Sequence, residues 1–507
     1  METAKVISFE TLTENVGRFN VKDKTFLIPQ MNRIGCHLLA AVFRGFGIKA
    51  RVMETFKGMD LGKEYTSGKE CYPCQITTGD ILFFLKKEKE RLGELFNPED
   101  YVYFMPESDG PCRFGMYNKY QRIILDSFPE FKRIRIGALT TRDGYSLEGI
   151  IDKEEVSDLR KASYFSVVVA DILDRLLWRI RPYEKEQGLA DEFIEKSMHV
   201  MEEVFELYGP KKDFDRILDR LEEIIEEGKQ IIDSSIPPKP LIGIVGEIYV
   251  RSHVYANQDL IKMIEKYGGE AVNASIAEWM NYTSYDRLRD AKIGLRLHLK
   301  QLRFGAVKQH LKKIANFWGD LFYQQLRQKQ VYKRVKKLID LADDHKIGHL
   351  EKILKKDDLF TFDVGTEACL SISGILEYAR EGFNGVVNAY PFTCMPSTTT
   401  SAIVKPLMDR LGVPYLDTPY DSRVTSQVER LPSEPLCTRP ISISNATEEG
   451  ISRSRSLVSR RMGLGTKSPL RGIRNTDLWA NGAVPERKGE FFIRRSTRWR
   501  IVFKNEV

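Results

Sequence analysis

Short apolar runs alternate with amphipathic segments along the first part of the chain. Four runs predict strands, at residues 25–28, 50–53, 101–105 and 133–139. Between them, residues 33–46, 76–91 and 116–127 have apolar positions at helical spacing. Because strand–helix alternation is typical of a parallel sheet covered by helices, residues 1–160 are expected to form a first α/β lobe.

The next segment, residues 161–240, has a helical pattern that ends in a proline-rich linker. Residues 214–233 combine apolar positions at helical spacing with opposite charges four residues apart. The sequence SSIPPKP at 234–240 contains three prolines, which cannot continue a helix. A domain boundary is therefore predicted there.

A second α/β lobe is predicted over residues 241–422. The apolar run LIGIVGEIYV at 241–250 is typical of a buried parallel strand. Further patterns predict a helix at 259–267, a strand at 269–273, a strand at 385–387 and a helix at 397–411, with a long Lys/Arg-rich helical insertion at 284–345. The fold class is therefore α/β, with tandem Rossmann-like parallel-sheet lobes and helical insertions.

The charge of the chain is unevenly distributed, and this changes the interpretation of its net charge of +7. Residues 423–507 contain 17 Lys and Arg against 8 Asp and Glu, whereas residues 1–422 contain 61 against 63. The basic character thus belongs to the tail, and nucleic acid is not the predicted partner. The charges of 284–345 are expected to form a solvated helix face, with an acidic partner as the alternative.

No apolar run is long enough to predict a membrane span, and the first residues lack a signal-peptide pattern. A cytoplasmic protein with reduced thiols is therefore expected.

The tail at 423–507 differs from the rest of the chain in its composition and in its pattern of apolar residues. Ser, Arg, Thr and Pro dominate it, and the apolar periodicity disappears. It is interpreted as a frameshifted reading frame, because a shifted back-translation can give an ordinary loop and an amphipathic helix. A disordered basic tail is the alternative. Resequencing the gene would decide between them, and no function is assigned to these residues.

Four of the seven cysteines lie in Gly- and Pro-containing motifs that precede helical patterns. Cys71 and Cys74 lie in GKECYPCQITTGD, Cys112 in ESDGPCRFGMYNKYQR and Cys394 in NAYPFTCMPSTTT. Open parallel sheets bind ligands at the carboxyl ends of their strands. Helix N-termini lower thiol pKa and favour negative charge. Four thiolates meeting there could hold an iron–sulfur cluster.

Two other interpretations of these cysteines stay open. Cys71 and Cys74 alone could form a dithiol redox pair at a helix start. Four thiolates would also suit a structural zinc ion, although zinc sites usually use two compact pairs.

Other candidate residues have plainer interpretations. Cys36 and Cys369 are expected to be core thiols, and His37 a packed histidine. Glu247 is expected inside a strand, as an acid facing a cleft or as the partner of Arg251, and His253 could face the same cleft. Arg113 and Lys119, beside Cys112, could tune the charge of a cluster or be solvated. No catalytic residue is predicted.

The cysteine motifs, together with GFNGVVNAYPFTCMPSTTTSAIVKPLM and VPYLDTPYDS, resemble the acyl-CoA dehydratase activase-related proteins. These are relatives of the 2-hydroxyacyl-CoA dehydratase cluster subunits and of the double-cubane cluster proteins. The resemblance covers residues 20–422 and ends where the tail begins. It implies a cytoplasmic iron–sulfur protein that transfers low-potential electrons, with Cys71, Cys74, Cys112 and Cys394 matching the family's cysteine motifs.

The resemblance also implies partners. These are an ATP-hydrolysing activator and either a CoA thioester substrate or a partner dehydratase subunit; a dimer is possible. FDVGTEACLSISG at 362–374 is only faintly similar to the phosphate turn of the activators, so another chain is expected to supply the ATPase. A single 4Fe-4S cluster is favoured over a double-cubane cluster, because two of the six cysteines before the tail look like core residues. A non-catalytic electron carrier or assembly subunit is the remaining alternative.

Overall fold

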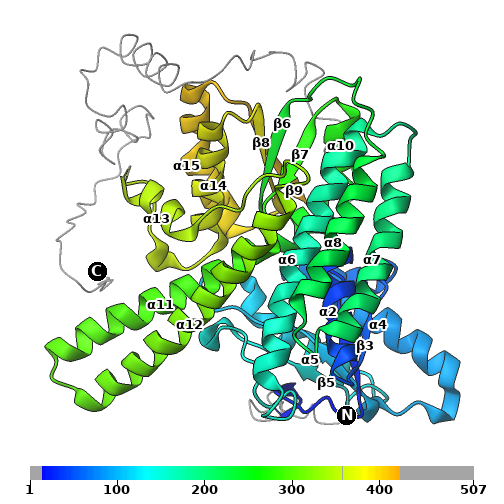
Figure 1. Ribbon diagram of the computed structural model, residues 1–507. Helices are drawn as coiled ribbons and strands as arrows, with labels where there is room; N and C mark the ends of the chain where they lie inside the picture. Colours follow the sequence, from blue (N-terminus) through cyan, green and yellow to red (C-terminus); the bar gives the residue numbers. More distant parts are fainter. Residues whose placement is uncertain (1–13, 357, 423–507) are drawn as a thin grey trace, which may run out of the picture. The chain divides into compact units, whose positions relative to one another are not determined.

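The computed structural model describes residues 14–356 and 358–422 of the 507-residue chain. These residues contain two parallel sheets, each flanked by helices (Figure 1). The predicted α/β fold with tandem parallel-sheet lobes is therefore confirmed. The predictions for residues 423–507 lie outside the described residues.

The first lobe contains a five-stranded parallel sheet with the order β1-β5-β4-β2-β3. All four predicted strands are present, each within two residues at either end, whereas β1 and α3 had no clear sequence pattern. The strands are β1 (Val16–Gly17), β2 (Thr25–Ile28), β3 (Lys49–Val52), β4 (Tyr101–Phe104) and β5 (Arg135–Gly137). The helices are α2 (Arg33–Gly45), α3 (Met59–Tyr65), α4 (Tyr72–Leu92) and α5 (Tyr117–Asp126), with 3₁₀ turns η1 (Gly93–Leu95), η2 (Pro98–Asp100), η3 (Arg113–Met116) and η4 (Thr141–Asp143).

The predicted helical segment does not stand apart from the first lobe. Its helices are α6 (Val156–Ile180), α7 (Leu189–Tyr208) and α8 (Phe214–Lys229), with the 3₁₀ turn η5 (Arg181–Tyr183). Their apolar side chains share one core with α2 and with sheet residues such as Phe26 and Val102. The segment therefore covers one face of the first sheet, while α4 and α5 contribute to the core on the other face.

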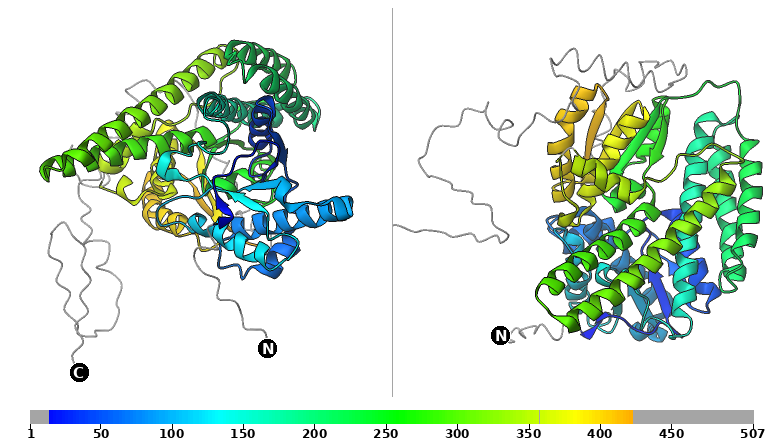
Figure 2. Two further views of the ribbon diagram at one scale, coloured as in Figure 1. Left: turned by 90° about the horizontal axis from the view of Figure 1, so that it is seen from below. Right: turned by 60° about the vertical axis from the view of Figure 1, so that its left-hand side comes forward.

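The second lobe contains a four-stranded parallel sheet with the order β7-β6-β8-β9. Its strands are β6 (Leu241–Gly246), β7 (Glu270–Asn273), β8 (Gly385–Pro391) and β9 (Tyr415–Tyr420). Its helices are α9 (Ile248–Ser252), α10 (Leu260–Lys266), α11 (Ile276–Lys300), α12 (Phe304–Val335), α13 (Ile347–Lys356), α14 (Glu367–Glu381) and α15 (Met395–Leu411), with the 3₁₀ turn η6 (Phe362–Val364). The predicted insertion is a helical hairpin of α11 and α12 that extends away from the sheets (Figure 2).

The prediction that 241–250 is one strand is wrong. The strand ends at Gly246, where the backbone has a φ of +120° and any Cβ would lie 2.1 Å from the carbonyl oxygen of Ala389. Glu247 then caps α9, and its carboxylate accepts hydrogen bonds from the N–H groups of Tyr249 and Val250. The apolar run continued because the helix is buried as well, so hydrophobicity alone did not mark the boundary.

The two lobes pack against each other through apolar side chains. Met59, Tyr72 and Ile76 of the first lobe share a core with Ile242 and Val250 of the second. Each sheet also has a point where the chain reverses its direction across the sheet, between β2 and β4 and between β6 and β8. Parallel sheets bind ligands outside the strand ends at such points.

Candidate functional site

A cavity of about 620 Å³ lies between the two lobes, and both reversal points contribute to it. Its wall includes Pro29 after β2, Met105 after β4, Glu247 after β6 and Cys394 after β8. Cys71 and Cys112 line the same cavity, which we call the thiol cavity. The topology therefore brings residues from distant parts of the sequence to one space.

Each of these three cysteines caps a helical element, as the sequence predicted. Cys71 precedes α4, Cys112 precedes η3 and Cys394 precedes α15. Burial raises the pKa of the Cys71 thiol to about 11 and that of Cys394 to about 12, and it also raises the pKa of Cys112. Backbone hydrogen bonds oppose this effect at each sulfur. They come from residues 72, 114 and 397, at the start of the helical element that each cysteine caps.

Cys74 lies in the first turn of α4 and does not line the thiol cavity. Its side chain is fully buried in the apolar core of the first lobe, and burial raises its pKa. The structure thus brings three of the four predicted cysteines to one cavity and leaves Cys74 in the core behind them. Cys36, expected to be a core thiol, is buried on α2 and donates to the carbonyl oxygen of Pro29, yet it also lines the cavity. Cys369 is a buried core thiol, as expected.

The backbone around the cysteines is strained. Cys71 has φ 102° and ψ 147°, a region that is essentially restricted to glycine, and Thr393 has φ 65°. Gly110, with φ +97°, brings the loop before Cys112 so close to the second lobe that a Cβ there would lie 2.9 Å from the carbonyl oxygen of Gly365. Strain of this kind persists at sites where the surrounding structure enforces it.

Arg113 connects the loops that carry the three cysteines. Its guanidinium donates to the carbonyl oxygen of Lys69, two residues before Cys71. It also donates to the carbonyl oxygen of Thr393 at 2.9 Å, and it follows Cys112 directly in the chain. Its charge lowers the pKa of Cys71 against the effect of burial. Of the roles considered for Arg113, the structure favours one at the site, whereas Lys119 forms an ion pair with Glu107.

Two carboxylates face the thiol cavity at the start of α9. Glu367, from the first turn of α14, interacts with the backbone of Ile248, next to the N–H groups that bind Glu247. Among the described residues, neither carboxylate forms an ion pair. Burial and then the neighbouring Glu247 raise the pKa of Glu367 to about 8, and burial raises that of Glu247. The pair therefore holds a proton at neutral pH.

Sequence reasoning gave a cleft as one of two alternatives for Glu247 and gave no signal for Glu367, because an acidic residue in the first turn of a helix is ordinary. The alternative that Glu247 pairs with Arg251 is not what the structure shows, since Arg251 donates to Asn273 and to the carbonyl oxygen of Ser275. His253 does not line the cavity. It is buried between Thr55, 2.8 Å from its Nε2, and the N–H of Ala256, which donates to its Nδ1.

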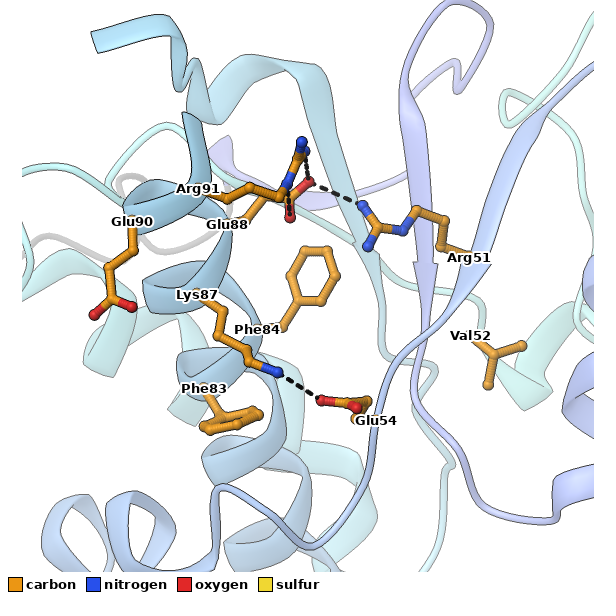
Figure 3. A pocket seen from close by; sticks show the side chains of 9 residues that line it. All are labelled: Arg51, Val52, Glu54, Phe83, Phe84, Lys87, Glu88, Glu90 and Arg91. Carbon is orange, nitrogen blue, oxygen red and sulfur yellow. Dashed lines mark hydrogen bonds and ion pairs between the residues drawn. The ribbon is translucent and has the colours of Figure 1, made fainter. Parts of the chain in front are cut away.

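A second hollow of about 680 Å³ lies on the first lobe (Figure 3). We call it the charged hollow. Arg51 and Arg91 both contact the Glu88 carboxylate, at 2.9 and 2.7 Å, and Lys87 contacts Glu54 at 3.1 Å. Its basic groups are thus matched by acidic ones within the wall. It contains none of the cysteines.

The described side chains include no group of three or more His, Cys, Asp or Glu arranged to hold a single metal ion. Within the same residues, no helix is long and apolar enough to cross a membrane. The chain matches no family model, and no curated protein matches it.

Proposed function

We propose that the thiol cavity holds an iron–sulfur cluster and that the chain transfers low-potential electrons, working with an ATP-hydrolysing activator protein. The observation that supports this most is that Cys71, Cys112 and Cys394, each at the start of a helical element, line one cavity between two lobes. The resemblance of the cysteine motifs to dehydratase cluster subunits points to the same function. An acceptor that is a CoA thioester or a partner dehydratase subunit is part of this proposal.

The donor chemistry of the cavity fits such a group. In the absence of a cation, burial holds these thiols in their protonated form, and a coordinating thiol loses its proton. Backbone N–H groups aimed at the sulfurs would stabilise the resulting negative charge. A cavity of about 620 Å³ far exceeds the space of one ion, which favours a cluster with an adjacent organic group over zinc. Cys74 stays a predicted ligand, one helical turn from Cys71.

When bound, an iron–sulfur cluster supplies one-electron transfer. The residues of this chain have three separate tasks around it. Buried apolar wall residues such as Ile28 and Met105 exclude water from their side of the cavity. Arg113 holds the cysteine loops together. Glu247 and Glu367 hold a proton at their carboxylates, within the same cavity.

The pKa values argue against the dithiol alternative. Reactive dithiols have a lowered thiol pKa and are accessible. Here the pKa of Cys71 is raised to about 11, and Cys74 is fully buried.

Anaerobic purification, analysis of iron, zinc and sulfide, and electron paramagnetic resonance test the proposal. We expect iron and sulfide in similar amounts and a signal that appears on reduction. A colourless protein with one zinc and no iron would refute it. As a control, Cys369→Ser should keep its iron and sulfide, because this thiol is buried but does not line the cavity.

A second measurement separates an enzyme from a carrier. Purified protein with its cluster, its activator and ATP should turn over a CoA thioester if it is catalytic. Reduction of the cluster without turnover would favour the electron carrier or assembly subunit.

A further inference from the structure

The α11–α12 hairpin has an apolar face that no described residue covers. On α12, five large apolar side chains are between 49% and 72% exposed, and they are separated by seven, seven, four and four residues. Such spacing places them along one side of a helix, as in a helix–helix seam. We call these residues the α12 stripe: Phe304, Leu311, Trp318, Phe322 and Leu326.

The two helices of the hairpin pack against each other through other apolar side chains, which are not part of the α12 stripe. Phe317 and Leu321 of α12 are buried against Leu288 of α11. Gly294 lets the helices approach closely, because a Cβ there would lie 2.3 Å from the ring of His310. The residues of the α12 stripe therefore take no part in the hairpin's own core. Exposed apolar surface that is this continuous marks an interaction site.

The stripe is self-complementary about Ala315. Phe304 and Leu326 lie eleven residues before and after it, and Leu311 lies as far before it as Gly319 lies after it. In an antiparallel pair of α12 helices crossing at Ala315, each Leu311 would face a glycine of the other copy. The space around Gly319 is open, with nothing within 4 Å of the position of a Cβ.

The same arrangement pairs the remaining aromatic residues with cations. Lys312 and Trp318 lie three residues on either side of Ala315, and Lys308 and Phe322 lie seven residues on either side. A lysine over an aromatic ring is a favourable contact. A two-fold interface requires one patch to fit itself in this way.

Charge favours an antiparallel second copy over other occupants. Residues 291–319 contain seven Lys and Arg and no Asp or Glu, so parallel hairpins would bring two basic tips together. At the other end of α12, Arg334 contacts Asp219 and Glu222 of α8. Residues 214–229 contain six acidic and three basic residues. An antiparallel copy would bring its basic tip toward this acidic helix, whereas the chain's own tail is basic.

We propose that the α12 stripe is a homodimer interface, in which a second copy of the chain packs α12 antiparallel across Ala315. This interface is separate from the thiol cavity and does not depend on the cofactor proposed for it.

Sedimentation velocity of the full chain tests the proposal. We expect a dimer at micromolar concentration. Leu311→Glu should weaken it at least 100-fold, because it places a buried carboxylate against Gly319 of the other copy, where no cation faces it. Leu411→Glu is the matched control, since Leu411 of α15 is 55% exposed but lies outside the stripe. Added salt should weaken the dimer several-fold. A wild-type chain that stays monomeric at about 100 μM, or a dimer unaffected by Leu311→Glu, would overturn the proposal.

Cross-linking tests the register. Ala315→Cys should give a covalent dimer on mild oxidation, because the two sulfurs would meet at the two-fold axis. Lys329→Cys, on the same helix beyond the stripe, should not. If a monomeric wild-type chain instead binds phosphatidylserine vesicles and Leu311→Glu abolishes this binding, the stripe is a membrane-binding face and the dimer proposal is wrong.

Discussion

The thiol cavity and the charged hollow have similar volumes, but their polar groups are satisfied in opposite ways. In the charged hollow, Arg51, Arg91 and Glu88 neutralise one another within hydrogen-bond distance. In the thiol cavity, four thiols and three carboxylates line the space, and among the described residues only Asp109 of these carboxylates has an ion-pair partner, Arg142. Arg113, the one cation among the lining residues, is tied to backbone carbonyls. Groups that find partners within the fold stabilise it, whereas groups left facing a cavity are available to a ligand. Volume alone would not have separated the two.

The largest effect should come from removing a cavity thiol. Cys112→Ser or Cys394→Ser should lower the affinity for iron and so reduce the bound iron. The loss of affinity should exceed the roughly 10–100-fold that follows removal of a residue that only hydrogen-bonds to a metal ligand. Iron and sulfide analysis after anaerobic purification measures it. Arg91→Ala, in the charged hollow, should leave the iron content unchanged, and equal losses in both variants would erase the contrast between the two regions.

Arg113→Met should have the next largest effect on iron. Loss of the guanidinium would free the loops that carry Cys71 and Cys394, and we expect iron affinity to fall about 10-fold. Competition with an iron chelator measures this. Arg133→Met is the control, because Arg133 pairs with Glu99 and neither residue lines the thiol cavity. Unchanged retention of iron in Arg113→Met would show that the loops hold their positions without it.

The carboxylate pair should give the cavity a distinct pH dependence. The pKa of Glu367 is raised in the folded state to about 8 from its usual 4.5, so the folded chain keeps a proton that the unfolded chain releases. Its contribution therefore makes the free energy of unfolding fall as pH rises from about 4.5 to 8. Urea denaturation of the iron-free protein across this range should show a smaller fall for Glu367→Gln. Identical slopes would contradict a shared proton.

The contribution of the charged hollow to the free energy of unfolding should depend on pH with the opposite sign, and the effect should be smaller. Arg91 and then Arg51 hold the pKa of Glu88 at about 2, below its usual value. Its contribution is present above about 4.5 and is lost as pH falls through 2. Because both arginines are at least half exposed, Glu88→Gln should cost only about 1 kcal/mol at pH 7. Urea denaturation at pH 7 and pH 3 measures it, and a loss of iron in this variant would link the two regions.

Much of the fold could be predicted because the periodicity of apolar residues within short segments determines most of its strands and helices. The strand at 25–28 and the helix at 33–46 follow directly from periodicity, and parallel strands followed by helices leave few arrangements. The pattern failed at Gly246, where a buried strand passes into a buried helix and both are apolar. It also missed α14, whose small residues and serines gave no clear periodicity.

The sequence by itself determined which chemical groups the site could use and that Cys71, Cys112 and Cys394 would each begin a helical element. A motif such as Cys71 before Pro73 records both the thiol and the helix start, because capping is a local property of the backbone. Only the tertiary structure decided which groups meet. Cys74 fell into the core while Cys36 reached the cavity wall, and Glu367 came beside Glu247. These placements depend on how helices from different lobes rotate and pack, and contacts between distant residues leave no trace in local periodicity.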